Sequence, residues 1–260
     1  MRWTRDELLI VLNLYHKLPF GQVSARQPVV MDLAERLGRT PASVSMKLGN
    51  LASFDPILKL RGIRGLTGAS ILDGEVWEEF HGDLQEFIPL SQELFDALFM
   101  ESATDIIEVI PGSGIRRRKI PLTGDTETLI LTKQRRGQDY FRDIVLNNFA
   151  NQCGLTGLPV RELLIASHIL PWRNHESERL NVRNGICLSR LHDAAFDQGL
   201  ISFDDELRMI LSSKLRSHLP QQAVESHFEA YETKMLDLPD DALLPEQAFL
   251  SAHRVRFEFH

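Results

Sequence analysis

Three short stretches in the second half of the chain decide the fold: residues 166–172 read ASHILPW, residues 184–188 read NGICL, and residues 192–201 read HDAAFDQGLI. The first two stretches belong to short apolar runs, which are typical of buried strands. The third begins a pattern that is typical of a helix. The sequence therefore predicts two short strands and a helix. A histidine lies at the end of the first strand, an asparagine at the start of the second, and a His-Asp pair at the opening of the helix.

This set of side chains suits the hydrolysis of a phosphodiester bond. Cutting that bond needs a base that deprotonates water and a cation that stabilises the crowded phosphate and the leaving oxygen. Imidazole is the natural base near neutral pH, and an amide can fix its tautomer through the other ring nitrogen. Carboxylates and imidazoles can hold a metal ion while leaving positions open for phosphate and water. A thiol nucleophile is disfavoured, because neither Cys153 nor Cys187 has a third, orienting partner.

The same residues resemble the HNH endonuclease family, in its restriction-endonuclease branch. The resemblance covers roughly residues 132–257, and its flanks also agree, since RGQDYFR at residues 136–142 and CGLTG at residues 153–157 precede the histidine strand. It implies a β-hairpin plus helix that cradles one divalent metal ion, with Mg²⁺ or Mn²⁺ expected. It also implies that His168 is the general base and that Asn184 orients it.

The resemblance leaves the metal ligands open. Many HNH enzymes carry Asp or His directly before the base, whereas this chain has Ser167. Either the serine ligates weakly through water, or the metal is held mainly from the helix. Counting nine and thirteen residues from the asparagine gives Asp193 and Asp197, which are one helical turn apart. Aligning on the histidine instead gives His192. We expect one of His192 and Asp193 to bind the metal with Asp197 nearby, although a carboxylate before a glycine turn often only fixes that turn.

The first 70 residues predict a separate module of three helices. Thr4 and Glu7 have the spacing of a capping box. Gly38 is suited to end a second helix at about residues 29–37, and Thr40-Pro41 is suited to begin a third. This layout is that of a helix-turn-helix and resembles the DNA-binding modules of Myb-like proteins.

We expect the third helix of this module to present an exposed polar face with Ser43, Ser45, Lys47 and Asn50. The side chains predicted to contact DNA there are Arg39, Ser43 and Lys47. The alternative is a plain three-helix scaffold with a solvated basic face.

Charge is distributed unevenly, although the whole chain has a formal net charge of −7. Residues 1–64 contain ten Lys or Arg and five Asp or Glu, a net charge of +5, whereas residues 72–108 contain eleven acidic and no basic residues. Arg116, Arg117 and Arg118 then begin another basic stretch. Local patches decide contact with phosphates, so a nucleic-acid partner is compatible with the acidic total. The three arginines either contact phosphate or belong to a soluble linker. Arg173 either binds the substrate phosphate or is a surface charge.

These features predict an α+β protein with three parts. Residues 1–70 form the helix-turn-helix-like domain, and residues 71–130 form an acidic helical connector followed by a basic linker. Residues 131–260 form the ββα-metal nuclease domain with flanking helices. The connector has apolar anchors at helical spacing, and a subunit contact is the alternative use for it.

The expected function is a divalent-metal-dependent endonuclease acting on specific or modified DNA, in restriction or phage defence. The alternatives are a DNA-binding regulator with a degenerate HNH scaffold, and a metal-dependent RNase or toxin. A homodimer is expected, because cutting both strands with single-site subunits favours two copies. The sequence also predicts a cytoplasmic protein without a membrane partner, since it has two cysteines, no apolar signal region and no run long enough to span a bilayer.

Overall fold

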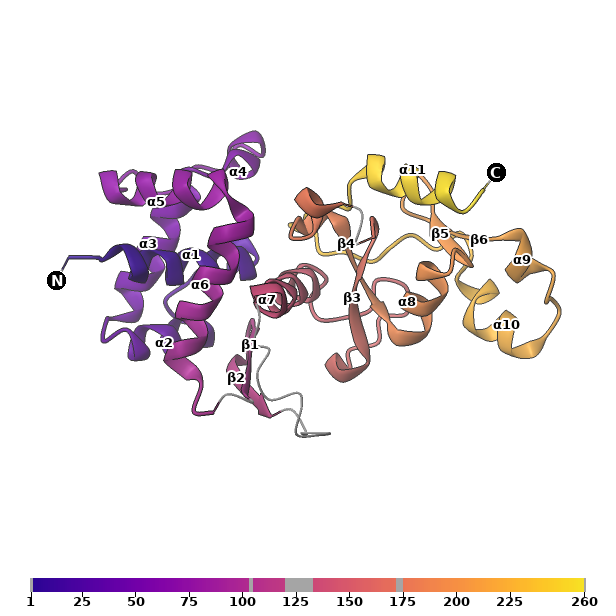
Figure 1. Ribbon diagram of the computed structural model, residues 1–260, viewed down its shortest axis with the longest axis horizontal. Helices are drawn as coiled ribbons and strands as arrows, with labels where there is room; N and C mark the ends of the chain where they lie inside the picture. The colour runs from indigo at the N-terminus through magenta and orange to yellow at the C-terminus, as the bar shows by residue number, and fades with distance from the viewer. Residues whose placement is uncertain (1, 103–104, 120–132, 172–174, 260) are drawn as a thin grey trace. The chain divides into compact units, whose positions relative to one another are not determined.

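The computed structural model describes residues 2–102, 105–119, 133–171 and 175–259. The chain forms two compact units, Met1–Ile144 and Val145–His260 (Figure 1). Helices and three two-stranded sheets occur together, which confirms the predicted mixture of α and β structure. Within the described residues, none of the helices has the length and apolar character that crossing a membrane requires.

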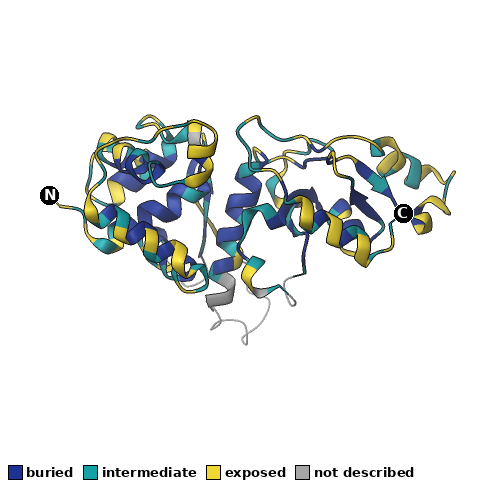
Figure 2. Cartoon of the chain, turned by 90° about the horizontal axis from the view of Figure 1, so that it is seen from above, coloured by how far each residue is buried: buried dark blue, intermediate teal, exposed yellow. Residues whose placement is uncertain are grey.

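The first unit is built around one central helix, α1 (Arg5–Lys17). Helices α3 (Pro41–Ala52), α5 (Ile71–Gly82) and α6 (Leu84–Phe99) pack against it, and α2 (Pro28–Arg36) packs against α3 (Figure 1). Almost every residue of α1 from Leu8 to Tyr15 is buried, so this helix lies inside the bundle rather than on its surface. In both units the buried residues lie inside and the exposed residues on the outer faces (Figure 2).

The predicted helix ends of this unit are confirmed. Thr4 Oγ1 accepts a hydrogen bond from Glu7 N at 3.3 Å, and Thr4 N donates to the Glu7 carboxylate at 2.8 Å, which completes the capping box. Thr40 caps α3 by accepting from Ser43 N at 3.2 Å. Gly38 follows α2 with a φ of +63°, a conformation that glycine adopts readily.

The expected exposure of Lys47 and Asn50 on α3 is wrong. Lys47 is 6% exposed, and its ammonium lies 2.8 Å from both carboxylate oxygens of Asp73 on α5. Asn50 is 7% exposed, and its amide donates to Gly68 O at 3.2 Å. A buried charge or amide needs a partner inside the protein, and the partners of these two side chains lie in the segment that follows α3. Both side chains therefore hold α3 to that segment. Lys47 therefore has no accessible charge to offer to a phosphate.

The segment predicted as a connector and linker contains a β-hairpin. Strands β1 (Asp105–Ile110) and β2 (Gly114–Lys119) pair antiparallel, and Glu108 lies opposite Arg116. The sequence did not predict these strands. The second strand reads GIRRRK and has almost no alternation of apolar and polar residues, so its sequence lacks the main signal of a strand.

The second unit contains the predicted strand, strand and helix. Strands β3 (Leu164–His168) and β4 (Gly185–Ser189) pair antiparallel with His168 opposite Gly185, and α8 (Arg190–Asp197) packs on both (Figure 1). Helix α7 (Lys133–Asn148) precedes them and spans the boundary between the two units. Flanking helices were predicted for this domain, and the last of the described helices is α11 (Gln247–Arg256).

Shorter elements complete the chain. A further hairpin follows α8 and was not predicted, because its strands β5 (Ile201–Phe203) and β6 (Met209–Leu211) have only three residues each. The remaining short helices are α4 (Pro56–Leu60), α9 (Ser213–Arg216) and α10 (Gln222–His227). Single 3₁₀ turns occur at Phe20–Gln22, Arg161–Leu163, Glu176–Glu178, Val182–Asn184 and Glu229–Tyr231.

Candidate active site

A hollow of about 430 Å³ lies in the second unit where β3, α8 and α11 meet. It brings together four of the residues that the sequence singled out, which come from β3 and α8, and two from α11 that the sequence did not connect with the site. Those six are Ser167, His168, Asp193, Asp197, His253 and Arg256. The close packing of α8 against the hairpin is what places its carboxylates beside the end of β3.

His168 is the last residue of β3, and its ring has a defined tautomer. Its Nε2 lies 3.0 Å from the carbonyl oxygen of Arg179. A carbonyl only accepts hydrogen bonds, so Nε2 carries the proton and Nδ1 is the basic nitrogen of the neutral ring. Burial lowers the pKa of His168, and the hydrogen bond to Arg179 opposes this effect only in part. The ring is therefore held in the neutral form that a general base needs near pH 7.

Asn184 is fully buried and acts on the backbone. Its Oδ1 accepts from Leu170 N at 2.8 Å, and its amide hydrogens go to Glu178 O at 3.0 Å and Leu170 O at 3.4 Å. Both amide hydrogens are thus used by carbonyls. Any orientation of His168 by Asn184 is therefore indirect. Asn184 holds the loop at the carbonyl of Glu178, and the carbonyl of the next residue, Arg179, fixes the imidazole.

Asp193 and Asp197 occupy adjacent turns of α8. Burial raises the pKa of Asp193, while the nearby Ser167 hydroxyl and Arg190 favour its charged form. The pKa of Asp197 is also raised, first by burial and then by the charge of Asp193. Neither carboxylate forms an ion pair with any residue in the described part of the chain. Two neighbouring carboxylates without an ion-pair partner in the described residues form a local site that favours a cation.

The hydroxyl of Ser167 supports the same conclusion. Ser167 is 1% exposed, and its Oγ has no hydrogen-bond partner of normal geometry within the described ranges. It lies near enough to the Asp193 carboxylate to stabilise that charge. A buried hydroxyl without a partner is uncommon in proteins, and a water or ion is the usual reason for one. The serine therefore fits a weak or water-mediated contact to a metal ion.

His192 has a structural role instead. It is 3% exposed, its Nδ1 lies 2.8 Å from Ser189 Oγ, and its Nε2 lies 2.9 Å from His227 O. Nε2 must donate to that carbonyl, so Nδ1 accepts from the serine hydroxyl. Both ring nitrogens are used inside the protein, and the ring packs edge-on against Phe228 and Tyr231. Of the two alternatives for the ligand on the helix, only Asp193 lines the hollow.

The donor set resembles an oxygen site for a hard cation. The described residues contain no group of three or more His, Cys, Asp or Glu side chains placed to hold a metal ion alone. Two carboxylates and a hydroxyl leave the rest of the coordination shell to water and substrate. Mg²⁺ suits such a site, because it keeps several waters and is bound by one or two carboxylates together with phosphate oxygens.

The sequence missed the contribution of α11. His253 is 3% exposed, its Nδ1 lies 2.9 Å from Ser202 Oγ, and its Nε2 donates to Phe196 O at 3.1 Å. Its ring stacks on Phe196 with centroids 3.9 Å apart, and burial lowers its pKa to about 4. His253 thus anchors α11 to α8. With this anchor, α11 is regular through Arg256.

Arg256 lies three residues after His253, on the same side of α11. Its side chain is exposed, lines the hollow and favours the charged form of Asp197. The three-residue spacing of His253 and Arg256 was the one signal in the sequence for a contribution of this helix to the site. It could not be interpreted without knowing which element the helix packs against.

The residues predicted to contact DNA lie in several places. Arg39 is engaged within the first unit, because its guanidinium contacts Glu7 at 2.8 Å and stacks on Trp3 at 3.8 Å. Ser43 is half-buried in the first turn of α3. Arg173 lies outside the described residues.

The three arginines of β2 are exposed, and two of them form ion pairs with acidic residues. Arg117 pairs with Glu101, and Arg118 lies 3.6 Å from Glu108. For Arg116, Arg117 and Arg118, contact with DNA stays a prediction.

Comparison with known families agrees with the geometry of the hollow. Residues 153–204 match the family model of the HNH endonucleases. The matched range contains β3, β4 and α8, and therefore both the His168 strand and the two carboxylates. The match supports the HNH family and a nuclease in general. A search of the curated proteins finds no match for the chain.

Proposed function

We propose that the protein is a divalent-metal-dependent endonuclease that hydrolyses phosphodiester bonds of DNA at the hollow formed by β3, α8 and α11. One observation carries the proposal. The imidazole of His168 is fixed through Nε2 to Arg179 O, which makes Nδ1 the basic nitrogen. It lines the same hollow as two carboxylates that have no ion-pair partner among the described residues. The HNH match over residues 153–204 supports the reaction class.

The residues of the hollow divide the chemistry between them. His168 accepts a proton from the attacking water at Nδ1. Asp193 and Asp197 would hold the cation, and the Ser167 hydroxyl would contact it weakly or through a water. When bound, Mg²⁺ or Mn²⁺ stabilises the negative charge on the phosphate and on the leaving oxygen. Arg256, which also lines the hollow, binds a non-bridging phosphate oxygen, since a guanidinium matches phosphate geometry well.

We further propose that the enzyme acts in restriction or phage defence on specific or modified DNA. The separate helical unit supports this role, because a nuclease that cuts selectively needs a part that selects or holds its substrate. Two copies of the chain would cut the two strands, with one metal ion in each site.

The direct test is a cleavage assay with the His168→Ala variant. Wild-type protein should nick modified or unmodified genomic DNA with Mg²⁺ or Mn²⁺ and should stop when EDTA is added. Loss of the base should slow cleavage about 10²- to 10⁴-fold. Unchanged cleavage by the folded variant would reject His168 as the base.

The pH dependence gives a second readout of the same residue. Because burial lowers the pKa of His168, Nδ1 stays unprotonated to a lower pH than in an exposed histidine. At saturating metal, the wild-type rate should hold as pH falls through the ordinary histidine value of about 6.5 and decline only below it. The residual activity of His168→Ala should not show this dependence on the imidazole. A wild-type rate that already falls above that value would contradict the assignment.

One observation favours a second candidate, a DNA-binding regulator with a degenerate HNH scaffold. Ser167 stands at the expected ligand position, and no group of three acidic, His or Cys side chains in the described chain is placed to hold a metal alone. Calorimetry with Mn²⁺ separates the two functions. The endonuclease requires binding that the double variant Asp193→Asn, Asp197→Asn abolishes, whereas the scaffold requires none. Cleavage of duplex RNA but not of matched DNA would instead indicate an RNase.

A further inference from the structure

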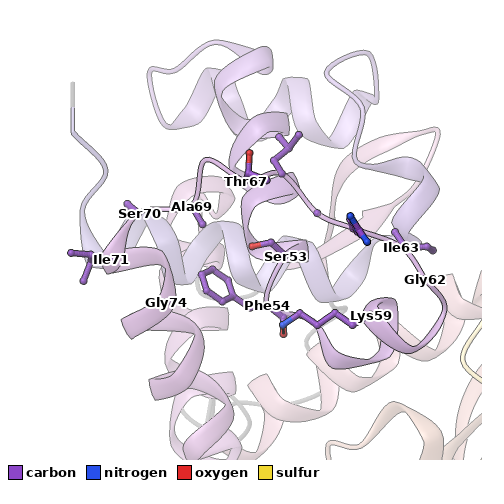
Figure 3. Close-up of a pocket in the computed structure, with 13 residues that line it drawn as sticks. Ser53, Phe54, Lys59, Gly62, Ile63, Thr67, Ala69, Ser70, Ile71 and Gly74 are labelled. Atoms are coloured by element: carbon purple, nitrogen blue, oxygen red, sulfur yellow. Dashed lines mark hydrogen bonds between the residues drawn. The ribbon is translucent and has the colours of Figure 1, made fainter.

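A second and larger hollow, of about 740 Å³, lies in the helical unit, and the proposed chemistry does not use it. Its walls come from the end of α3, from α4, from the loop at residues 61–69 and from the first turn of α5. Figure 3 shows the Phe54 ring between Lys59 on one side and the turn that runs from Ala69 to Gly74 on the other. Its volume is within the range of sites that bind small organic ligands.

The hollow is preformed, because its loop is fixed to α3 by close backbone contacts. A Cβ atom on Gly65 would lie 2.2 Å from Ser53 N, so only glycine allows the loop to approach here. Leu66 N donates to Gly49 O at 2.9 Å, and the Asn50 amide holds Gly68 O at 3.2 Å. The buried Asn50, which was expected to face solvent, thus has a role in shaping this wall.

The side chains that line the hollow combine an aromatic ring with positive charge. Phe54 is half-buried and is supported by Trp77, with ring centroids 6.0 Å apart. Lys59 and Arg64 are exposed at the rim, and none of the residues lining the hollow is acidic. Hydroxyl groups come from Ser53, Thr67 and Ser70. An aromatic face, two cations and several hydroxyls without a carboxylate suit an anionic ligand with a flat ring.

We propose that this hollow binds one nucleotide that is extruded from duplex DNA, with its base against Phe54 and its phosphates at Lys59 and Arg64. Bases stack on aromatic side chains, and lysine and arginine neutralise the backbone phosphates that flank them. The hydroxyls and the loop backbone can then contact the edges of the base. DNA as the ligand rests on the proposed endonuclease function, which this inference deepens by naming where a base is selected.

Extrusion gives a measurable signature. A mispaired base costs less to remove from the stack than a paired one, so a protein that extrudes a base binds a mismatched duplex more tightly. Anisotropy titrations in EDTA, where no cutting occurs, should therefore compare a fluorescein-labelled duplex with the same duplex carrying one central mismatch. Full-length wild-type protein should bind the mismatched duplex about tenfold more tightly.

Two variants assign that preference to the hollow. Phe54→Leu keeps apolar volume but removes the stacking face, and Arg64→Ala removes an exposed cation without touching the core. Each should lower affinity for the mismatched duplex about tenfold and reduce the preference. The charge-matched control Arg26→Ala changes another exposed arginine of the same unit, and its preference should equal that of the wild type. Equal wild-type affinity for the two duplexes, or a preference that Phe54→Leu and Arg64→Ala both retain, would overturn the proposal.

Parallel cleavage assays with Mg²⁺ test the nucleotide site and the proposed endonuclease function separately. A wild-type protein that cuts DNA but binds both duplexes equally overturns the nucleotide site and leaves the endonuclease intact. A protein that prefers the mismatch through Phe54 and does not cut supports the site and rejects the endonuclease.

Discussion

The two units of the chain use charged side chains in opposite ways. In the helical unit, buried cations each meet a carboxylate from another element: Lys47 meets Asp73, and Lys17 lies 3.3 Å from Asp143. In the hollow of the second unit, Asp193 and Asp197 come from the same helix, and neither has an ion-pair partner in the described residues. Carboxylates thus connect helices through ion pairs in one unit, whereas in the other the two carboxylates of the hollow have no ion-pair partner among the described residues.

The difference separates structural from functional charge. Removing one member of a buried ion pair leaves the other charge in a medium of low polarity, which destabilises the fold. Removing one of two carboxylates that repel each other takes that repulsion out of the folded protein. Its expected cost is a lower affinity for the cation. Stability and activity should therefore respond in opposite ways to substitutions in the two regions.

The largest expected effect is on cleavage by Asp193→Asn. Losing a metal-binding carboxylate should slow cutting about 10³-fold, which corresponds to about 4 kcal/mol in the barrier. Because burial disfavours the charge of Asp193, and the charge of Asp193 in turn disfavours that of Asp197, the metal-free variant should unfold at the same temperature as the wild type or above it. Cleavage rates and thermal unfolding in EDTA measure both. A variant that is clearly less stable than the wild type would remove the contrast between the two regions.

A smaller effect is expected for Lys47→Ala, and it should fall on stability instead of cleavage. Asp73 would keep a buried charge without its partner, so the free energy of unfolding should fall by about 3 kcal/mol. Urea unfolding measures it, and the exposed Lys59→Ala should stay within about 0.5 kcal/mol of the wild type. Cleavage per folded molecule should be unchanged in Lys47→Ala. A stability equal to that of the wild type would show that this pair does not act as a structural link.

The smallest effect is expected for Arg256→Ala. The side chain is exposed, so stability should not change, while loss of a phosphate contact should slow cutting about tenfold. Lys214→Ala removes a charge from an exposed site that does not line the hollow, and it serves as the matched control in the same assay. Equal rates for the two variants would exclude Arg256 from substrate binding.

Much of the site could be predicted from sequence because its signals are local. Apolar runs of strand length, the asparagine at the start of the second strand and the four-residue spacing of the carboxylates all lie within about thirty residues, and the strand, strand and helix occur as expected. The caps of α1 and α3 were equally readable, since a cap involves residues three positions apart. The hairpin at residues 105–119 was missed because β2 has too little apolar alternation.

What the sequence by itself determined is the set of side chains and the elements that carry them: a histidine, an asparagine and two carboxylates on a strand, a second strand and a helix. Tertiary structure alone decided which groups are accessible. It placed His192 against His227 O and Asp193 in the hollow, buried Lys47 on Asp73, and brought Arg256 to the site from the far end of the chain. The physical reason is that a side chain is available for a ligand only when no group inside the protein already satisfies it. The groups that do so here lie up to dozens of residues away along the chain.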